Sequence, residues 1–146
     1  MPKRPEDKKP LRILIVDDVE LQRVSLKALL EFIIQQKKDI EFAATGEEAI
    51  KKLGETDFDI IFLDNTLPGR NGFSVLQEKQ IRGLKGEVIF ISGHDEEEFI
   101  EKARRLGARY YLTKGGMDMT QLTDAVNAIL YESPYIVEDT SMVQNR

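Results

Sequence analysis

Three carboxylates of this sequence follow short apolar runs of the kind that form buried strands. Asp17 and Asp18 come directly after the run "ILIV", and Asp64 ends the run "FDIIFLD". Neighbouring carboxylates repel each other, and removing them from water costs free energy. Asp18 could cap the helix that follows, because Asp accepts hydrogen bonds from free backbone N–H groups at a helix start. Capping would explain one acid of the adjacent pair but not both.

A cation is the simplest partner for acids that gather in one place. The sequence has no cysteine, and its single histidine is His94, so thiolate sites and multi-histidine sites are excluded. Oxygen ligands alone favour a hard ion such as Mg²⁺. Asp17, Asp18 and Asp64 are therefore the candidate metal ligands, and such a metal leaves positions open for phosphate oxygens.

Two further polar residues end apolar runs. Ser92 ends "EVIFIS", and Lys114 ends "RYYLTK". Ser92 can donate a hydrogen bond to a phosphoryl oxygen, and Lys114 can pair with a carboxylate or a phosphoryl group. One of the carboxylates could then attack phosphorus as a nucleophile and form an acyl phosphate, with Mg²⁺ and Lys114 offsetting the charge of the transferring group.

The elements that must position these residues alternate along the chain. Apolar runs predict strands over 11–18, 39–45, 58–65, 87–92 and 109–114, and helical spacing predicts helices over 20–36, 46–55, 72–84, 95–108 and 118–132. This alternation predicts an α/β fold with a five-stranded, parallel, doubly wound sheet and helices on both faces, because a closed barrel needs eight strands.

Glycines mark two expected turns. Gly54 is expected to end the second helix. The run "LPGRNG" predicts a tight turn in which Pro68 fixes φ and either Gly69 or Gly72 takes a positive φ.

Ligands of open parallel sheets bind outside the carboxyl ends of the strands. In the predicted fold, all five chemistry-bearing residues follow or end a strand and therefore share one rim of the sheet. They are Asp17, Asp18, Asp64, Ser92 and Lys114.

Length and composition set the broad class. The chain has 146 residues, of which 41% are hydrophobic, and this suits one domain with a sizeable core. The net charge of −5 gives no general electrostatic attraction to nucleic acid or to an anionic membrane. No secretory signal or membrane-spanning run is present in the sequence, so a cytoplasmic protein with no direct nucleic-acid or membrane partner is expected.

Four motifs in this order carry a family resemblance. "IVDDVE", "FLDNTLPGRNG", "VIFISG" and "YYLTK" resemble the receiver domain of two-component response regulators, over about Leu11 to Ser133. The resemblance implies the flavodoxin-like strand order 2-1-3-4-5. It also implies a signalling phosphoacceptor that assists only its own phosphorylation and dephosphorylation, and not an enzyme with a separate substrate.

The resemblance assigns roles to the acidic set. Asp64 is the residue that accepts a phosphoryl group from a sensor histidine kinase or a histidine phosphotransfer protein. Mg²⁺ is held by Asp17, Asp18, Asp64 and the backbone carbonyl of Thr66. Lys114 pairs first with Asp64 and then with the phosphoryl group.

The resemblance also implies a switch. Ser92 binds the phosphoryl group, and Tyr111 turns inward when Ser92 moves, which changes the face formed by the fourth helix, the fifth strand and the fifth helix. A plain core aromatic is the alternative for Tyr111, and an exposed loop residue is the alternative for His94. The run Lys114-Gly115-Gly116 departs from the family, which usually has proline after this lysine; a cis bond is not expected here, and the loop is expected to be more mobile.

Other function classes fit the residues less well. A phosphatase of the haloacid dehalogenase type needs a second acid two residues after its nucleophile, where Thr66 stands. A flavodoxin-type flavin binder needs a hydroxyl-rich loop where Asp17 and Asp18 stand. A scaffold without phosphorylation gives no reason for the full acidic set.

The expected organisation is a flexible N-terminal extension over 1–10, a receiver domain over 11–133 and a C-terminal tail over 134–146. No output domain fits after residue 133, so a stand-alone regulator that controls a downstream protein or forms a homodimer is favoured. The alternative is a receiver excised from a larger regulator with a DNA-binding or enzymatic output domain.

Overall fold

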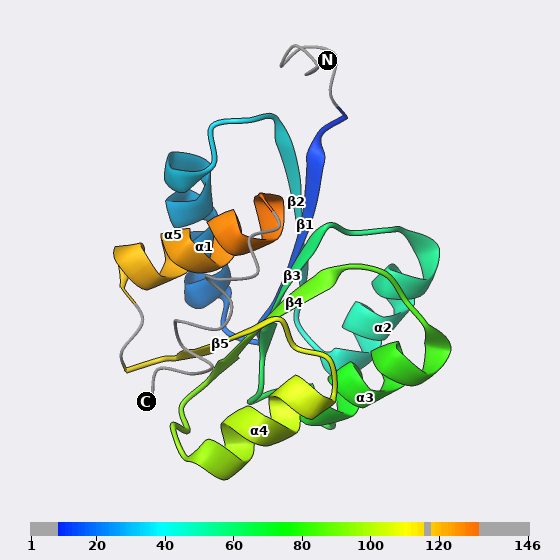
Figure 1. Cartoon of the computed structure of the whole chain (residues 1–146). Coiled ribbons are helices and arrows are strands. Elements are labelled where there is room, and N and C mark those ends of the chain that lie inside the picture. The colour runs from blue at the N-terminus through cyan, green and yellow to red at the C-terminus, as the bar shows by residue number, and fades with distance from the viewer. Residues whose placement is uncertain (1–8, 116–117, 132–146) are drawn as a thin grey trace.

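The computed structural model describes residues 9–115 and 118–131, in which five strands alternate with five helices (Figure 1). The strands are β1 (Leu11–Val16), β2 (Lys38–Ala43), β3 (Ile60–Asp64), β4 (Glu87–Ser92) and β5 (Tyr110–Thr113). The helices are α1 (Glu20–Ile33), α2 (Gly46–Glu55), α3 (Gly72–Arg82), α4 (Glu97–Arg105) and α5 (Met119–Leu130). Every predicted element is present, and each predicted boundary lies within three residues of the observed one.

The five strands form one parallel sheet in the order β2-β1-β3-β4-β5, which confirms the expected fold. The register aligns the carboxyl ends of the central strands: Val16 pairs with Leu63, Asp64 with Ile91, and Ser92 with Thr113. Consequently the polar residues that end β1, β3, β4 and β5 lie along one rim.

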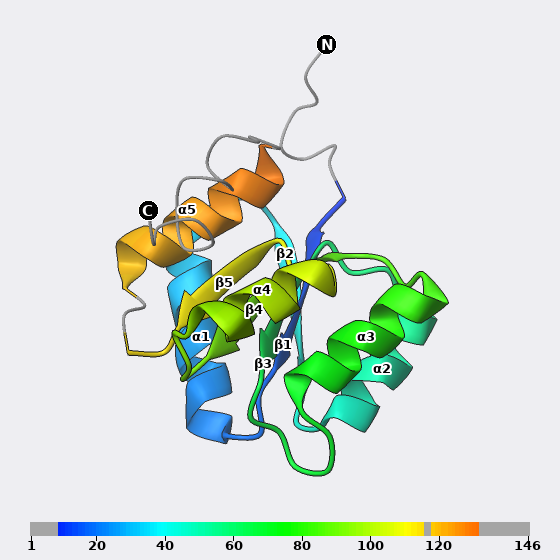
Figure 2. The ribbon, with the colours of Figure 1, turned by 60° about the horizontal axis from the view of Figure 1, so that its bottom comes forward.

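The sheet separates two apolar cores. Helices α1 and α5 cover one face, and helices α2, α3 and α4 cover the other (Figures 1 and 2). Successive side chains of a strand point to opposite faces. In β5, therefore, Tyr110 packs in the core under α1 and α5, and Tyr111 packs in the core under α2, α3 and α4.

Helices α2, α3 and α5 begin with a capping side chain: Thr45, Asn71 and Asp118 each accept a hydrogen bond from the backbone N–H three residues later. The expectation for Gly54 was wrong: this residue lies inside α2, which ends at Glu55. Glycines with positive φ instead follow two other helices: Gly83, with φ 66°, after α3, and Gly107, with φ 105°, after α4.

The turn between β3 and α3 resolves the choice between its two glycines. Gly69 has φ 83°, whereas Gly72 begins α3 with an ordinary helical backbone. Residues 1–8, most of the expected N-terminal extension, lie outside the described residues, as do Gly116 and the whole 134–146 tail. None of the helices that the structure describes has the length and apolar composition needed to cross a membrane.

Candidate functional site

The three predicted carboxylates meet at the carboxyl rim of the sheet. Asp17, Asp18 and Asp64 each place a carboxylate oxygen within 4.8 Å of the others. Asp64, the last residue of β3, is 2% exposed, and Asp17 is 9% exposed, whereas Asp18 is exposed to solvent. The Asp17 N–H donates to the Ala43 carbonyl at 3.0 Å, so the hydrogen bonds that fix β1 to β2 continue into the site.

Asp17, and not Asp18, makes the hydrogen bonds that join the end of β1 to the start of α1. Its Oδ1 accepts from the Val19 N–H at 2.9 Å, and its carbonyl accepts from the Arg23 guanidinium at 2.7 Å. The idea that Asp18 caps this helix is wrong, because the N-cap residue is Val19 and no side chain caps it. Burial raises the pKa of Asp17, and the negative charges of Asp64 and Asp18 raise it further.

Lys114 is the cation that contacts this cluster. Its Nζ lies 3.0 Å from Asp64 Oδ1, and its backbone N–H donates to the Ser92 carbonyl at 2.8 Å. The backbone bond extends the pairing of β5 with β4 and carries the lysine to the rim. Gly115 is not held in a left-handed conformation, and a Cβ there would meet no atom within 4 Å. The described structure therefore gives no steric reason for glycine at this position.

The segment after Asp64 is fixed by short contacts. The Thr66 N–H donates to Asp64 Oδ1 at 3.2 Å, and the Gly72 N–H donates to the Asn65 carbonyl at 2.9 Å. A Cβ on Gly72 would stand 2.8 Å from the Asn65 Cα and 2.9 Å from the Asp64 carbonyl oxygen. Glycine at the start of α3 thus permits the close approach of this helix to the acidic site.

Arg70 holds the same segment and was not identified from the sequence. Its guanidinium bonds the Ser74 hydroxyl and carbonyl at 3.1 Å each, and it pairs with Glu78 at 2.7 Å and with Glu47 of α2 at 3.6 Å. Hydrogen bonds from Arg70 and Arg82 lower the pKa of Glu78. The spacing of four residues to Ser74 and eight to Glu78 could have indicated the contacts of Arg70 along α3. Its contact with Glu47 of α2 depends on the tertiary fold.

The predicted switch residues lie next to each other inside the protein. Ser92 is fully buried, and its Oγ accepts from the His94 N–H at 3.1 Å. Tyr111 is 1% exposed, and its hydroxyl donates to the His94 carbonyl at 2.6 Å. Burial raises the pKa of Tyr111. The aromatic side chain therefore already occupies the interior in this structure.

The residues present fit a divalent cation. Three carboxylates against one ammonium leave two net negative charges, and the described residues provide no other cation in ion-pair contact with Asp17 or Asp18. The donor set consists only of oxygen atoms, as Mg²⁺ prefers. The rim can therefore hold a metal ion beside Asp64 while Lys114 contacts the same carboxylate.

An apolar stripe on α1 borders the site. Leu21, Val24, Leu29 and Phe32 are exposed although the helix also buries Leu26 and Leu30. A pocket of about 330 Å³ runs from this stripe to Asp17 and Lys114 and is lined mostly by apolar surface. Exposed apolar surface of this kind is typical of a protein contact.

The rim geometry agrees with a comparison of the chain with known families, in which residues 13–127 match the response regulator receiver domain. The chain belongs to this family. The receiver domain is 32% identical over 111 residues to the nitrate/nitrite response regulator protein NarL of Escherichia coli K12, which covers 74% of the chain and 50% of NarL. It is 27% identical over 129 residues to the response regulator UvrY of the same organism, which covers 88% of the chain and 58% of UvrY. The chain thus spans about half the length of these curated relatives.

Solved structures agree. The receiver domain superposes with a TM-score of 0.75 and 25% identity on a chain of the CheX–CheY–BeF3–Mg²⁺ complex from Borrelia burgdorferi, over 88% of this chain and 98% of that one. The family assignment makes this a signalling domain with the strand order that the motifs implied.

Proposed function

We propose that this receiver domain is a phosphoacceptor and that Asp64 is the residue that is phosphorylated. The observation that carries the proposal is the placement of one buried carboxylate, Asp64, between two acids and an ammonium group 3.0 Å away. The proposed donor is a phosphohistidine of a sensor histidine kinase or of a histidine phosphotransfer protein. The similarity to a chain of the CheX–CheY–BeF3–Mg²⁺ complex supports the same chemistry.

In the proposed step, a carboxylate oxygen of Asp64 forms a bond to phosphorus as the bond between phosphorus and the donor imidazole nitrogen breaks. The imidazole leaves with the electron pair of that bond. Lys114 contacts Asp64 before transfer and can then bind the phosphoryl oxygens, and the Ser92 hydroxyl can donate to another of them. Asp17, Asp18, Asp64 and the Thr66 carbonyl would hold Mg²⁺, which would supply positive charge for the transferring group.

Movement of Ser92 is the proposed origin of the switch. Its Oγ now accepts from the His94 N–H, so turning toward a phosphoryl group breaks this bond. Because the Tyr111 hydroxyl is already inside and bonded to the His94 carbonyl, we expect a movement of the loop around His94 to change the position of Tyr111 within the interior. The affected face includes α4, β5 and α5, and it would control a downstream partner protein or a homodimer.

The stripe on α1 is the proposed surface for the donor. It is apolar, exposed and continuous with the pocket that reaches Asp17 and Lys114. A partner seated on Leu21 and Leu29 would bring its phosphohistidine to the rim from the open side of the pocket.

The wider context of the domain is also a proposal. We place the receiver domain at 11–133, with an extension over 1–10 and a tail over 134–146. Two arrangements fit: a regulator that acts through a separate protein, and a receiver that is part of a longer regulator. Relatives of both lengths match: NarL and UvrY extend well beyond the matched region, whereas the matched chain of the CheX–CheY–BeF3–Mg²⁺ complex is covered over 98% of its length.

The test is labelling by acetyl phosphate. We expect the Asp64→Asn protein to take up no phosphate in Mg²⁺, while the exposed Asp95→Asn control labels like the wild type. Removing Mg²⁺ with a chelator should abolish labelling of the wild type. Equal labelling of the Asp64→Asn protein and the wild type would contradict the assignment.

A further inference from the structure

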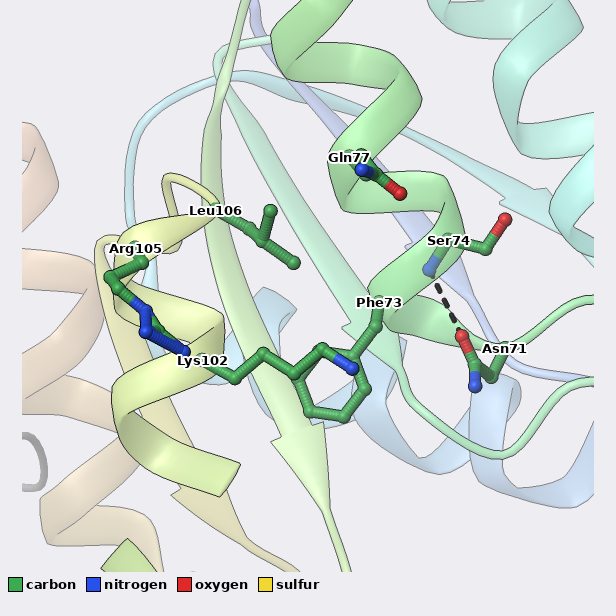
Figure 3. A pocket seen from close by; sticks show the side chains of 7 residues that line it. All are labelled: Asn71, Phe73, Ser74, Gln77, Lys102, Arg105 and Leu106. Atoms are coloured by element: carbon green, nitrogen blue, oxygen red, sulfur yellow. Dashed lines mark hydrogen bonds between the residues drawn. The ribbon is translucent and has the colours of Figure 1, made fainter. Parts of the chain in front are cut away.

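A cleft of about 430 Å³ lies between α3 and α4, on the sheet face opposite α1 and α5 (Figure 3). Its apolar surface comes from half-buried Leu106 and from the small accessible part of Phe73, which is 7% exposed. Its polar side chains come from both helices: Asn71, Ser74 and Gln77 at α3, and Lys102 and Arg105 of α4.

The polar side chains of the cleft can all donate a hydrogen bond, and no carboxylate lines it. Asn71 Oδ1 accepts from the Ser74 N–H at 2.9 Å, which leaves the amide NH₂ group of Asn71 for a ligand. Lys102 and Arg105 form no ion pair with the carboxylates of the described residues, whereas Arg104 between them does. This donor-rich, cationic lining on a chain of net charge −5 is complementary to an anionic group.

We propose that the cleft between α3 and α4 docks an acidic segment of a partner protein. Carboxylates of that segment would lie against Lys102 and Arg105, and a neighbouring apolar side chain would cover Phe73 and Leu106. The apolar surface favours a protein segment over a free anion, because a hydrated ion gains nothing from contact with an aromatic ring. Lys102 Nζ already lies 4.6 Å from the centre of the Phe73 ring, so the cation and the apolar surface form one continuous contact area.

Aromatic contacts connect this cleft to the switch loop. Phe73 stacks on Phe90 with 4.9 Å between ring centres and lies 6.1 Å from Phe99. Phe99 stacks on the His94 ring at 4.3 Å, and Phe90 lies 5.7 Å from Tyr111. A partner that immobilises Phe73 and α4 therefore restricts the loop whose N–H donates to Ser92. This coupling rests on the proposed function, but docking alone does not.

Linkage is reciprocal, so phosphorylation should change the affinity of the cleft for its partner. We expect a change of about 5- to 150-fold, the usual range for coupled sites. The cleft would thus be a second output surface, which shares α4 with the face of α4, β5 and α5 but lies on its α3 side.

The docking test uses amide NMR of the unphosphorylated full chain, titrated with the acetylated peptide Glu-Glu-Leu-Phe-Glu-Glu. We expect saturable shifts within residues 71–77 and 102–106, and none with the same peptide carrying Gln in place of every Glu. The double variant Lys102→Gln, Arg105→Gln should bind the acidic peptide about 5- to 30-fold more weakly, as two exposed ion pairs predict. The matched control is Arg104→Gln, which removes the paired arginine of the same helix turn and should leave binding unchanged.

Two results would overturn the docking proposal. The first is shifts that are absent at low-millimolar peptide, or that are unaffected by the double variant. The second is inorganic pyrophosphate binding to the same residues as tightly as the peptide, which would assign the cleft to small anions.

The coupling is tested by repeating the titration with beryllofluoride and Mg²⁺. If the Asp64 and Ser92 amides shift but the peptide affinity is unchanged, the coupling is wrong. If those two amides do not shift, the proposed phosphorylation site has failed instead, and the docking result stands by itself.

Discussion

Asp17 and Asp18 are adjacent acids with different surroundings. In extended backbone at the end of β1, successive side chains point in opposite directions, so Asp17 turns inward and Asp18 faces solvent. The inward acid bears the desolvation cost and contributes to the start of α1, and the outward acid is free to bind an ion. The pair is therefore placed to bind a cation, and its burial and mutual repulsion lower the stability of the metal-free protein.

The raised pKa of Asp17 gives a stability prediction. The folded metal-free protein binds the proton of Asp17 more tightly than the unfolded chain does. The free energy of unfolding therefore falls as pH rises from the ordinary pKa of Asp to the raised one. The Asp17→Asn protein should escape this loss and melt at a higher temperature than the wild type at pH 7 in a chelator. The gain should shrink on acidification and reverse in excess Mg²⁺, which stabilises only a protein that binds it.

Thermal unfolding followed by circular dichroism, from pH 4 to pH 8 with and without Mg²⁺, measures this effect. A lower melting temperature for Asp17→Asn at neutral pH in chelator would show that the hydrogen bond to Val19 needs the charge of Asp17.

Removing Lys114 should lower the stability of the metal-free protein, whereas the Asp17→Asn substitution should raise it. Without it, the buried Asp64 loses its counter-charge and faces two acids. We expect Lys114→Ala to lower the free energy of unfolding by about 1–3 kcal/mol in chelator, less than for a fully buried pair because Lys114 is one-third exposed. Mg²⁺ should restore much of the loss. Urea titration is the measurement, and the exposed Lys85→Ala protein is the control. An equal loss with and without Mg²⁺ would argue for a packing role of the lysine stem.

At the scale of elements, the strands and the rim were predictable, and the surroundings of single helix residues were not. Continuous apolar runs and the parallel-sheet rule were enough to bring the ends of β1, β3, β4 and β5 together. Helix α1 is apolar on too many sides for its pattern to distinguish buried Leu26 and Leu30 from exposed Leu21 and Phe32. Likewise, sequence proximity to a helix end favoured Gly54 as its terminator, whereas α2 runs through Glu55 and the Thr56 N–H still donates to the Lys52 carbonyl.

Two glycine substitutions distinguish a helix position that tolerates a side chain from one where the backbone of the site is too close. Gly54→Ala should stabilise the protein by about 0.5–1 kcal/mol, because alanine favours helix and its Cβ would meet only the movable end of Arg82 at 3.2 Å. Gly72→Ala should destabilise it by about 1–3 kcal/mol, because its Cβ would press on the backbone of Asp64 and Asn65. The same variant should slow labelling by acetyl phosphate. Urea unfolding of both proteins measures the difference, and a Gly72→Ala protein as stable as the wild type would show that α3 can move away from the site.

At the scale of the whole molecule, phosphorylation should reach beyond the rim. We expect beryllofluoride with Mg²⁺ to shift amide NMR signals between Glu96 and Ala128 as well as those of the active-site loops, because Ser92, His94 and Tyr111 contact one another. The Asp64→Asn protein is the control and should show no shifts. Changes confined to the surroundings of Asp17, Asp64 and Ser92 would leave Tyr111 as a core aromatic without a switching role.

The sheet separates two apolar cores whose residues can change independently in evolution. Residues under α1 and α5 share no core contacts with residues under α2, α3 and α4, so substitutions in one core should be nearly additive with those in the other. Tyr111, Phe90 and Phe73 belong to one core, and the α1 residues that support the proposed donor surface belong to the other. If the donor binds the stripe on α1 and a partner binds the cleft between α3 and α4, as proposed, the supports of these two surfaces lie in different cores and could change independently in descendants of this chain.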